Sequence, residues 1–468
     1  MRVLFVTPEC APLTKTGGLG DVSAALPAAL RRLGHDVRIL LPGYGKVLAG
    51  LQNARAAATL TAVGIETRLL ETDEFLVLDC PSLYRRSGGP YQNAQGEDWP
   101  DNGLRFGLLS RVAALLSCAG GPLSWKPDIV HCNDWPSALA PVFLKSEEKP
   151  AASVMTVHNL AFQGVFERAL AARLGLPESA LSIEGLEFYG RISFLKGGLA
   201  CADAITTVSP TYAREIQTGE LGCGLDGLLR QRREVLWGIL NGIDDEAWNP
   251  ATDARIAQRY DFSTVEKKGA NKTALQRRMN LELAAEVPLL GCVCRFTHQK
   301  GVDLLAAAAD ELIALPAQIC VLGAGDREHE SALRALAARH PAKVGVAIGF
   351  DEDLAHLIEA GADIFLMPSR YEPCGLNQMY SQRYGTPPVA RATGGLVDTI
   401  VDGQTGFLFE RAESAALAAA VRRAVAACGE RHRWREIQRR GMERDFSWAA
   451  PARQYASLYS RLAGSRQT

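Results

Sequence analysis

The chain has 468 residues, and 51 lysines and arginines against 52 aspartates and glutamates give it a net charge of −1. This length exceeds the ~100–200 residues of a usual domain, which predicts two or three domains and excludes one small module. With 47% hydrophobic and 22% charged residues, the composition is that of an ordinary globular protein. A charge balance near zero provides no overall field toward nucleic acid or anionic lipid, so neither is an expected partner.

The sequence contains no run of the ~18 uncharged apolar residues that a membrane helix needs. Arg422 and Arg423 interrupt the apolar run 415–427, and two acidic residues interrupt the run 304–315. We therefore expect no membrane association. The first expected strand, 2–6, begins directly after Met1 and leaves no signal or transit segment, which leads us to expect a cytoplasmic location. The 11 cysteines are scattered, which favours reduced thiols over a disulfide framework or a zinc site.

Short apolar runs alternate with longer helical patterns along the chain, which is typical of βα units and parallel sheets. The strands expected in the first half are 3–6, 37–40, 75–78, 128–131, 153–157 and 204–208, and the helices include 19–33 and 102–116. The strands expected in the second half are 289–295, 319–322, 344–348, 364–367 and 389–390. The sequence therefore predicts an α/β fold with two doubly wound, Rossmann-like domains.

Glycine, aspartate and proline residues at 241–250 interrupt this pattern near the middle of the chain. We expect an amino-terminal domain at 1–243, a carboxyl-terminal domain at 244–450, and a terminal helix at 451–468 that packs back on the first domain. Ligands of open parallel sheets bind outside the carboxyl ends of the strands. The two domains are therefore expected to face one deep cleft, with the functional residues directly after strands.

The first expected strand leads into Lys15-Thr-Gly-Gly-Leu-Gly-Asp-Val and then into a helix. Glycines at a turn from strand to helix let backbone N–H groups approach an anion, and Lys15 adds a positive charge. The segment matches neither the P-loop nor the dinucleotide pattern, so a plain tight turn remains an equal interpretation. On spacing alone the choice between a phosphate-binding loop and a turn stays open.

This segment resembles the opening of the bacterial and plant glycogen and starch synthases, which are retaining glucosyltransferases of the two-domain GT-B fold. Further matches follow in the same order along nearly the whole chain: Asp98-Trp99, Asn102, Arg105-Phe106, Asn133-Asp134-Trp135, 157–164, 222–228, 241–244, Arg295, Lys300-Gly301 and 368–376. One motif could arise by chance, but an ordered set of this length is highly specific. The resemblance implies transfer of glucose from ADP-glucose to the non-reducing end of an α-1,4-glucan, with retention of configuration and release of ADP.

The residues after the second-half strands suit a nucleotide donor. Arg295 and Lys300 follow the strand 289–295, and two fixed positive charges suit a pyrophosphate leaving group whose charge grows as its bond breaks. Glu372 follows the strand 364–367, and a helix beginning near Gly375 would direct free N–H groups toward a sugar or a phosphate. By resemblance, Glu372 lies near the donor glucose, which it holds while stabilising positive charge. Each of these residues, taken alone, would be read as an ordinary solvated surface side chain.

The resemblance assigns catalytic roles to Glu372, His158, Lys300 and Arg295. The donor-binding set that it implies comprises Lys15, Gly17, Gly18, Asp21, Asn159, Asn241, Arg295, Lys300, Phe350, Cys374, Gly375, Leu376, Thr393 and Gly394. The imidazole and carboxamide of His158 and Asn159 can bond glucose hydroxyls, and Phe350 stands where relatives stack an aromatic ring on adenine. For the glucan acceptor we expect Tyr91, Trp99 and Asp134, although an aromatic residue in a loop is more often simply packed.

No second carboxylate has an evident nucleophilic role, so we expect transfer on one face of the sugar, assisted by the departing phosphate. No metal or other cofactor is expected, and the sequence does not give the oligomeric state. A retaining GT-B transferase that uses UDP-glucose, or a different acceptor, would share most of these motifs. A nicotinamide-dependent oxidoreductase would need a glycine fingerprint, and the segment after Gly323-Ala-Gly325 has Glu328 at the place of the third glycine. A non-catalytic glucan-binding relative should have lost Glu372 or the two cations.

Overall fold

The computed structural model describes residues 1–464, which form two compact units. The first comprises Met1–Asn241 together with the segment from Trp448 onward, and the second comprises Gly242–Ser447. The chain therefore leaves the first unit, builds the second, and returns. The units begin and end within a few residues of the domain limits expected from sequence.

The first unit is built on a nine-stranded sheet in the order β12-β11-β7-β6-β1-β2-β5-β4-β3. All neighbours pair in parallel except β3 with β4 and β4 with β5, which are antiparallel. The strands are β1 (Arg2–Val6), β2 (Asp36–Pro42), β3 (Arg55–Ala62), β4 (Ile65–Glu71), β5 (Phe75–Asp79), β6 (Ile129–Asn133), β7 (Ala152–Val157), β11 (Ala204–Thr207) and β12 (Leu236–Gly238). A separate small antiparallel sheet has the order β8-β10-β9 and consists of β8 (Val165–Phe166), β9 (Glu187–Phe188) and β10 (Arg191–Ser193).

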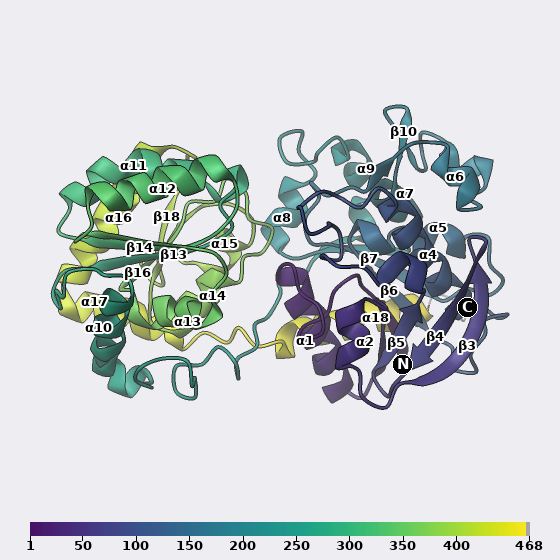
Figure 1. Cartoon of the computed structure of the whole chain (residues 1–468), viewed down its shortest axis with the longest axis horizontal. Coiled ribbons are helices and arrows are strands. Elements are labelled where there is room, and N and C mark those ends of the chain that lie inside the picture. The colour runs from purple at the N-terminus through teal and green to yellow at the C-terminus, as the bar shows by residue number, and fades with distance from the viewer. Residues whose placement is uncertain (465–468) are drawn as a thin grey trace. The chain divides into compact units, whose positions relative to one another are not determined.

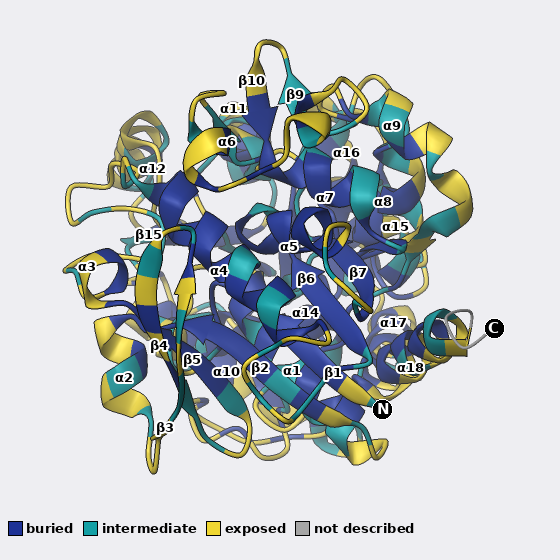
Figure 2. Cartoon of the chain, turned by 90° about the vertical axis from the view of Figure 1, so that its right-hand side faces the viewer, coloured by how far each residue is buried: buried dark blue, intermediate teal, exposed yellow. Residues whose placement is uncertain are grey.

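Helices lie on both faces of this nine-stranded sheet. Figure 1 shows α4, α5 and α7 on one side and α1, α2 and α18 on the other. The helices of the unit are α1 (Gly18–Arg32), α2 (Gly45–Gly50), α3 (Pro81–Tyr84), α4 (Asn102–Leu116), α5 (Leu139–Leu144), α6 (Leu170–Arg173), α7 (Phe194–Cys201), α8 (Pro210–Glu215), α9 (Asp226–Gln231) and α18 (Ala449–Gly464). Every residue of β6 and β7 is buried, as expected for parallel strands covered on both faces (Figure 2).

The helix α18 packs on this first unit. It contacts α1, and the hydroxyl of Tyr459 lies 2.7 Å from Nδ1 of His131 in the central strand β6. The ring of Tyr455 lies against the same imidazole, with 5.2 Å between ring centroids. Through these contacts, the segment after Ser447 completes the core of a unit that begins at Met1.

The second unit has a six-stranded, fully parallel sheet in the order β15-β14-β13-β16-β17-β18. Its strands are β13 (Leu289–Val293), β14 (Gln318–Gly323), β15 (Val344–Ile348), β16 (Ile364–Met367), β17 (Pro388–Arg391) and β18 (Phe407–Phe409). Its helices are α10 (Lys268–Arg278), α11 (Val302–Ala314), α12 (Arg327–Arg339), α13 (Glu352–Gly361), α14 (Asn377–Arg383), α15 (Gly394–Thr399), α16 (Ser414–Gly429) and α17 (Arg431–Met442). In Figure 1, α11, α12 and α16 cover one face, and α10, α13 and α14 cover the other.

The α/β class and the two doubly wound units expected from the sequence are confirmed. All the strands predicted from apolar runs form, with small shifts of their ends; for example, β13 ends at Val293, so Cys294 and Arg295 follow the strand instead of closing it. All eleven cysteines are free thiols. None of the helices within residues 1–464 is both long enough and apolar enough to cross a membrane.

Candidate functional site

The connection order of the second unit creates a switch point between β13 and β16. Numbered along the chain, its strands run 3-2-1-4-5-6, the order of dinucleotide-binding folds, and ligands of such sheets bind where this order reverses. The loop after β13 contains Arg295 and Lys300, and the loop after β16 contains Ser369 and Glu372. The two loops that carry these predicted residues therefore follow adjacent strands at one edge of the sheet.

Lys300 and Glu372 form a largely buried ion pair at this edge. The ammonium Nζ lies 2.5 Å from Oε2 of Glu372, and the two side chains are 18% and 6% exposed. The hydroxyl of Ser369 donates to the same carboxylate oxygen at 3.0 Å. The positive charge expected to face a pyrophosphate is thus shared with Glu372. The carboxylate of Glu372 therefore fixes the ammonium of Lys300 in place.

The loops after β13 and β16 are tied together by their backbones. Gly301 has a φ of +66°, and a Cβ there would lie 2.0 Å from the carbonyl oxygen of Pro368, so only glycine permits this approach. The N–H of Arg370 donates to the carbonyl of Gln299 at 2.8 Å. The Arg370 guanidinium also holds both carboxylate oxygens of Asp303, each at 2.6 Å. These contacts fix the separation of Lys300 and Glu372.

The predicted turn at Thr393 and Gly394 packs directly on the main chain of Glu372. Gly394 has a φ of +47°, and a Cβ there would lie 1.9 Å from the carbonyl oxygen of Glu372. The N–H of Gly395 donates to that carbonyl at 3.1 Å. The turn therefore packs against the loop of Glu372, and its Gly394 is also the first residue of α15.

The remaining predicted residues of this unit lie around the same edge. Arg295 is exposed directly after β13, and Cys374 is buried beside Glu372. Gly375 has a φ of +71°, and Leu376 is the residue that caps α14. Phe350 follows β15 and is 85% exposed, so its ring is open to a stacking partner.

The first unit has its own switch point, between β1 and β6. Lys15, in the loop after β1, forms an ion pair of 2.8 Å with Asp21 of α1. Gly17 caps that helix, and Gly18 is its first residue. The loop is therefore the expected strand-to-helix turn, placed at a sheet edge where ligands bind.

Two of the N–H groups on which the phosphate-binding interpretation of this loop depends already have a partner in the chain. The N–H groups of Thr16 and Gly17 donate to Oε2 of Glu9, at 2.5 and 3.3 Å. A carboxylate of the protein therefore accepts two N–H groups that could otherwise have served an anion. The sequence shows Glu9 three positions after the buried strand β1 and close to a glycine-rich loop. This pattern does not indicate the direction in which the Glu9 side chain points.

Asp134 and His158 lie at neighbouring strand ends and are bonded to each other. The carboxylate of Asp134 accepts the backbone N–H of His158 at 2.7 Å. Asp134 has a φ of +53°, which brings its side chain back toward the loop after β7. Burial raises the pKa of this carboxyl to about 7, against the lowering effect of N–H groups from His158 and Asn159.

The imidazole of His158 is neutral. Burial lowers its pKa to about 3. Its Nε2 lies 3.0 Å from Oδ1 of Asn133, while the amide nitrogen of Asn133 donates to the carbonyl of Val6 at 3.1 Å. Since that Oδ1 can only accept, Nε2 of His158 must donate, and Nδ1 is left as an acceptor. Asn133 therefore sets the tautomer of the predicted catalytic histidine.

The first unit also carries the two predicted donor-binding asparagines. Asn159 follows His158 and accepts the N–H of Ala161 through Oδ1 at 3.1 Å. Asn241, the last residue before the chain enters the second unit, is 6% exposed. Its Oδ1 is buried and has no hydrogen-bond partner within residues 1–464.

The predicted acceptor-binding aromatics have different surroundings. The Tyr91 hydroxyl donates to Oε1 of Glu9 at 2.8 Å, and its ring packs between Phe106 and Trp135, with centroid distances of 5.8 and 6.3 Å. Trp99 instead donates through Nε1 to the carbonyl of Gly89 at 3.2 Å. The structure thus brings Tyr91 to the loop of Lys15, and Trp99 lies in the same loop as Tyr91, to whose carbonyl its backbone N–H donates at 3.0 Å.

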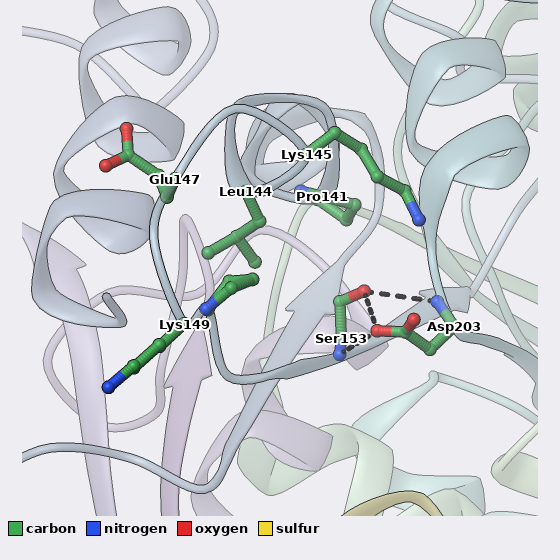
Figure 3. A pocket seen from close by; sticks show the side chains of 8 residues that line it. Pro141, Leu144, Lys145, Glu147, Lys149, Ser153 and Asp203 are labelled. Atoms are coloured by element: carbon green, nitrogen blue, oxygen red, sulfur yellow. Dashed lines mark hydrogen bonds between the residues drawn. The ribbon is translucent and has the colours of Figure 1, made fainter. Parts of the chain in front are cut away.

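A surface pocket of about 750 Å³ lies at the opposite edge of this sheet, where β7 and β11 begin. Figure 3 shows Lys145, Lys149 and Glu147 around it, with the Ser153 hydroxyl bonded to Asp203 at 2.8 Å. None of the predicted site residues lines this pocket. Within the described part of the chain, no three His, Cys, Asp or Glu side chains gather in a way that could hold a metal ion.

Sequence comparison matches both units to families of transferases. The family described as "Starch synthase catalytic domain" matches residues 2–231, and "Glycosyl transferases group 1" matches residues 276–441. The chain is 56% identical to the glycogen synthase of Aromatoleum aromaticum, covering 98% of this chain and 96% of that protein. It is 50% identical to the glycogen synthase of Nitrosospira multiformis, covering 100% and 98%.

A solved structure gives the same result. The catalytic domain of starch synthase IV from Arabidopsis thaliana, bound to ADP and acarbose, superposes with a TM-score of 0.87 at 32% identity, covering 99% of each chain. The GT-B class and the resemblance drawn from the ordered motifs are confirmed. By family match, identity and fold together, the chain belongs to the glycogen and starch synthase family of glycosyltransferases.

Proposed function

We propose that this protein is a glycogen synthase that transfers glucose from ADP-glucose to the non-reducing end of an α-1,4-glucan, with retention of configuration and release of ADP. The observation that supports this most is the Lys300–Glu372 pair at the switch point of the second unit. The ADP bound to the Arabidopsis enzyme favours this nucleotide over UDP.

In this proposal Arg295, Lys300 and the turn at Thr393 and Gly394 bind the diphosphate, and Phe350 stacks on the adenine. As the bond from C1 of glucose to the phosphate oxygen breaks, negative charge grows on that phosphate, and the two cations stabilise it. Glu372 keeps Lys300 in position and holds the sugar. Cys374, Gly375 and Leu376 border the same position.

On the first unit, Lys15, Gly17, Gly18 and Asp21 complete the donor contacts. The neutral His158 offers its Nδ1 lone pair beside the sugar, since its Nε2–H is held by Asn133. Asn159 and Asn241 supply hydrogen bonds to the glucosyl group. Tyr91, Trp99 and Asp134 bind the glucan.

The transfer proceeds on one face of the sugar. The acceptor hydroxyl forms its bond to C1 on the side that the phosphate leaves, and its proton passes to the departing phosphate. Neutralisation by Arg295 and Lys300 makes a metal ion unnecessary, so chelation with EDTA should leave the rate unchanged. The cytoplasmic location expected from the sequence stays a prediction.

The test is incorporation of labelled glucose from ADP-glucose into glycogen, compared with UDP-glucose at equal concentration. We expect incorporation from ADP-glucose to be at least ~10-fold faster, with new α-1,4 linkages seen by NMR. Faster transfer from UDP-glucose would replace the donor but keep the reaction. No incorporation from either sugar would overturn the proposed function.

A further inference from the structure

Glu9 is a buried carboxylate that no role assigned above uses. It lies in the loop between β1 and α1, is 3% exposed, and has hydrogen bonds at both oxygens. Oε2 accepts the N–H groups of Thr16 and Gly17, at 2.5 and 3.3 Å, and Oε1 accepts the Tyr91 hydroxyl at 2.8 Å.

The backbone of Glu9 is anchored as firmly as its side chain. The hydroxyl of Thr7, at the end of β1, donates to the carbonyl of Glu9 at 2.9 Å and lies 2.9 Å from the hydroxyl of Ser23 in α1. The carboxylate therefore projects from a fixed point at the switch point of the sheet. It holds two loops that lie outside the helices and strands of the unit and contain isolated β-bridges.

The two loops belong to opposite sides of the proposed reaction. Thr16 and Gly17 directly follow Lys15 and lead into α1, on the donor side. Tyr91 and Trp99 belong to the acceptor side, and the N–H of Trp99 donates to the carbonyl of Tyr91 at 3.0 Å. One side chain thus fixes both.

Keeping a charge at this place is costly, since burial raises the pKa of Glu9 above its usual value. The three donors oppose this effect and lower the pKa. A plain packing role would be met by an apolar side chain without that cost. The three donors are satisfied together only by an acceptor with two oxygens.

We propose that Glu9 is a positioning residue that fixes the Lys15 loop and the Tyr91 loop in a single geometry, so that the donor and acceptor contacts of the first unit depend on one carboxylate. This inference rests on the proposed function. The N–H groups of Thr16 and Gly17 then serve Glu9, and Lys15 contacts the donor through its side chain.

The test measures KM and kcat for both substrates in Glu9→Gln, Glu9→Ala and Tyr91→Phe. Glu9→Ala releases both loops and should raise KM for ADP-glucose and for glucan by at least ~10-fold each. Tyr91→Phe removes only the bond to Oε1, so it should raise KM for the glucan alone. Glu9→Gln keeps the size and one acceptor oxygen, and should lie between wild type and Glu9→Ala.

The matched control is Glu359→Gln in the second unit, since Glu359 is 2% exposed and equally buried. It should leave both KM values unchanged. A double-mutant cycle of Glu9→Gln with Tyr91→Phe should be non-additive in the glucan KM, since both act through one bond. Hydrogen exchange over residues 10–20 of the ligand-free chain should speed up in Glu9→Ala and stay unchanged in Tyr91→Phe.

Two results separate the possible failures. If wild type transfers glucose, and folded Glu9→Ala and Glu9→Gln keep both KM values within twofold, the positioning role is refuted while the proposed function stands. If wild type transfers nothing, the proposed function fails, and the hydrogen exchange of residues 10–20 still decides whether Glu9 holds the loop.

Discussion

At the scale of single residues, substitutions in the Lys300–Glu372 pair should affect the stability of the fold and the turnover to different extents. Lys300→Ala leaves a carboxylate that is 6% exposed without its cation. We expect a loss of roughly 3 kcal/mol in the free energy of unfolding, measured by urea denaturation, and a fall in turnover of at least ~100-fold.

The control is the double variant Lys300→Met with Glu372→Gln, which removes both charges at similar volume. It should recover most of the lost stability and none of the turnover. Near-normal turnover in both Lys300→Ala and Glu372→Ala would contradict the assigned roles.

Asp134 and His158 should affect the acid stability of the first unit in opposite directions. His158 has a pKa of about 3 in the folded chain, against ~6.5 when unfolded. The unfolded chain therefore binds more protons, and the free energy of unfolding falls as the pH drops below 6.5. Asp134 has its pKa raised to about 7, so the folded chain takes up its proton first, and this contribution grows as the pH drops below 7.

The two effects nearly cancel in the wild type between pH 6.5 and 5. Asp134→Asn removes the compensation, so its free energy of unfolding should fall by about 2 kcal/mol more than that of wild type over this interval. His158→Gln leaves the Asp134 contribution uncompensated, so its free energy of unfolding should rise relative to that of wild type as the pH drops over this interval. Denaturant titrations at three pH values measure both slopes, and parallel slopes for all three proteins would refute the pKa directions.

At the scale of elements, the turn at Gly394 is the support of the Glu372 loop. Gly394→Ala places a Cβ 1.9 Å from the carbonyl oxygen of Glu372. We expect thermal denaturation to show a destabilisation of at least ~3 kcal/mol, together with a fall in turnover of ~10-fold or more, because that loop must move.

Gly403 offers a matched control. It also has a positive φ, +71°, but a Cβ there has no neighbour within 4 Å. Gly403→Ala should cost only the ~1–2 kcal/mol of a left-handed alanine and keep the turnover. Equal losses in the two variants would show that backbone strain, and not the close approach, governs the position.

Most of the parallel strands were predictable because burial on both faces leaves continuous apolar runs, as in β6 and β7. The three-residue parallel strands β12 and β18 were not predicted. β3 was not predicted, since it alternates small, exposed and polar residues at the sheet edge. The site residues were likewise predictable in part. The placement of Lys300 and Glu372 after strands could be read from the sequence, but their ion pair, and the bonds of Glu9 to Thr16 and Gly17, depend on loop conformations that only the folded chain sets. Ser369 and Asn133 were missed as site residues for the same reason.

At the scale of the whole molecule, α18 ties the chain back to the unit in which it began. Tyr459→Phe removes the hydroxyl that lies 2.7 Å from the His131 imidazole. We expect it to lower the free energy of unfolding of the first unit by about 1 kcal/mol. Differential scanning calorimetry should show a lower midpoint for the transition of the first unit. The transition of the second unit, identified as the one that Gly403→Ala shifts, should keep its midpoint.

The interrupted first unit also has a consequence for synthesis on the ribosome. After Asn241 emerges, about 200 residues of the second unit follow before Trp448, which at ~5–20 residues per second takes roughly 10–40 s. During that interval β6 exists without Tyr455 and Tyr459, so the core around His131 is uncovered in the nascent chain. The second unit, whose segment Gly242–Ser447 is continuous, can close its sheet first, and the earlier-made half of the protein is the later one to mature.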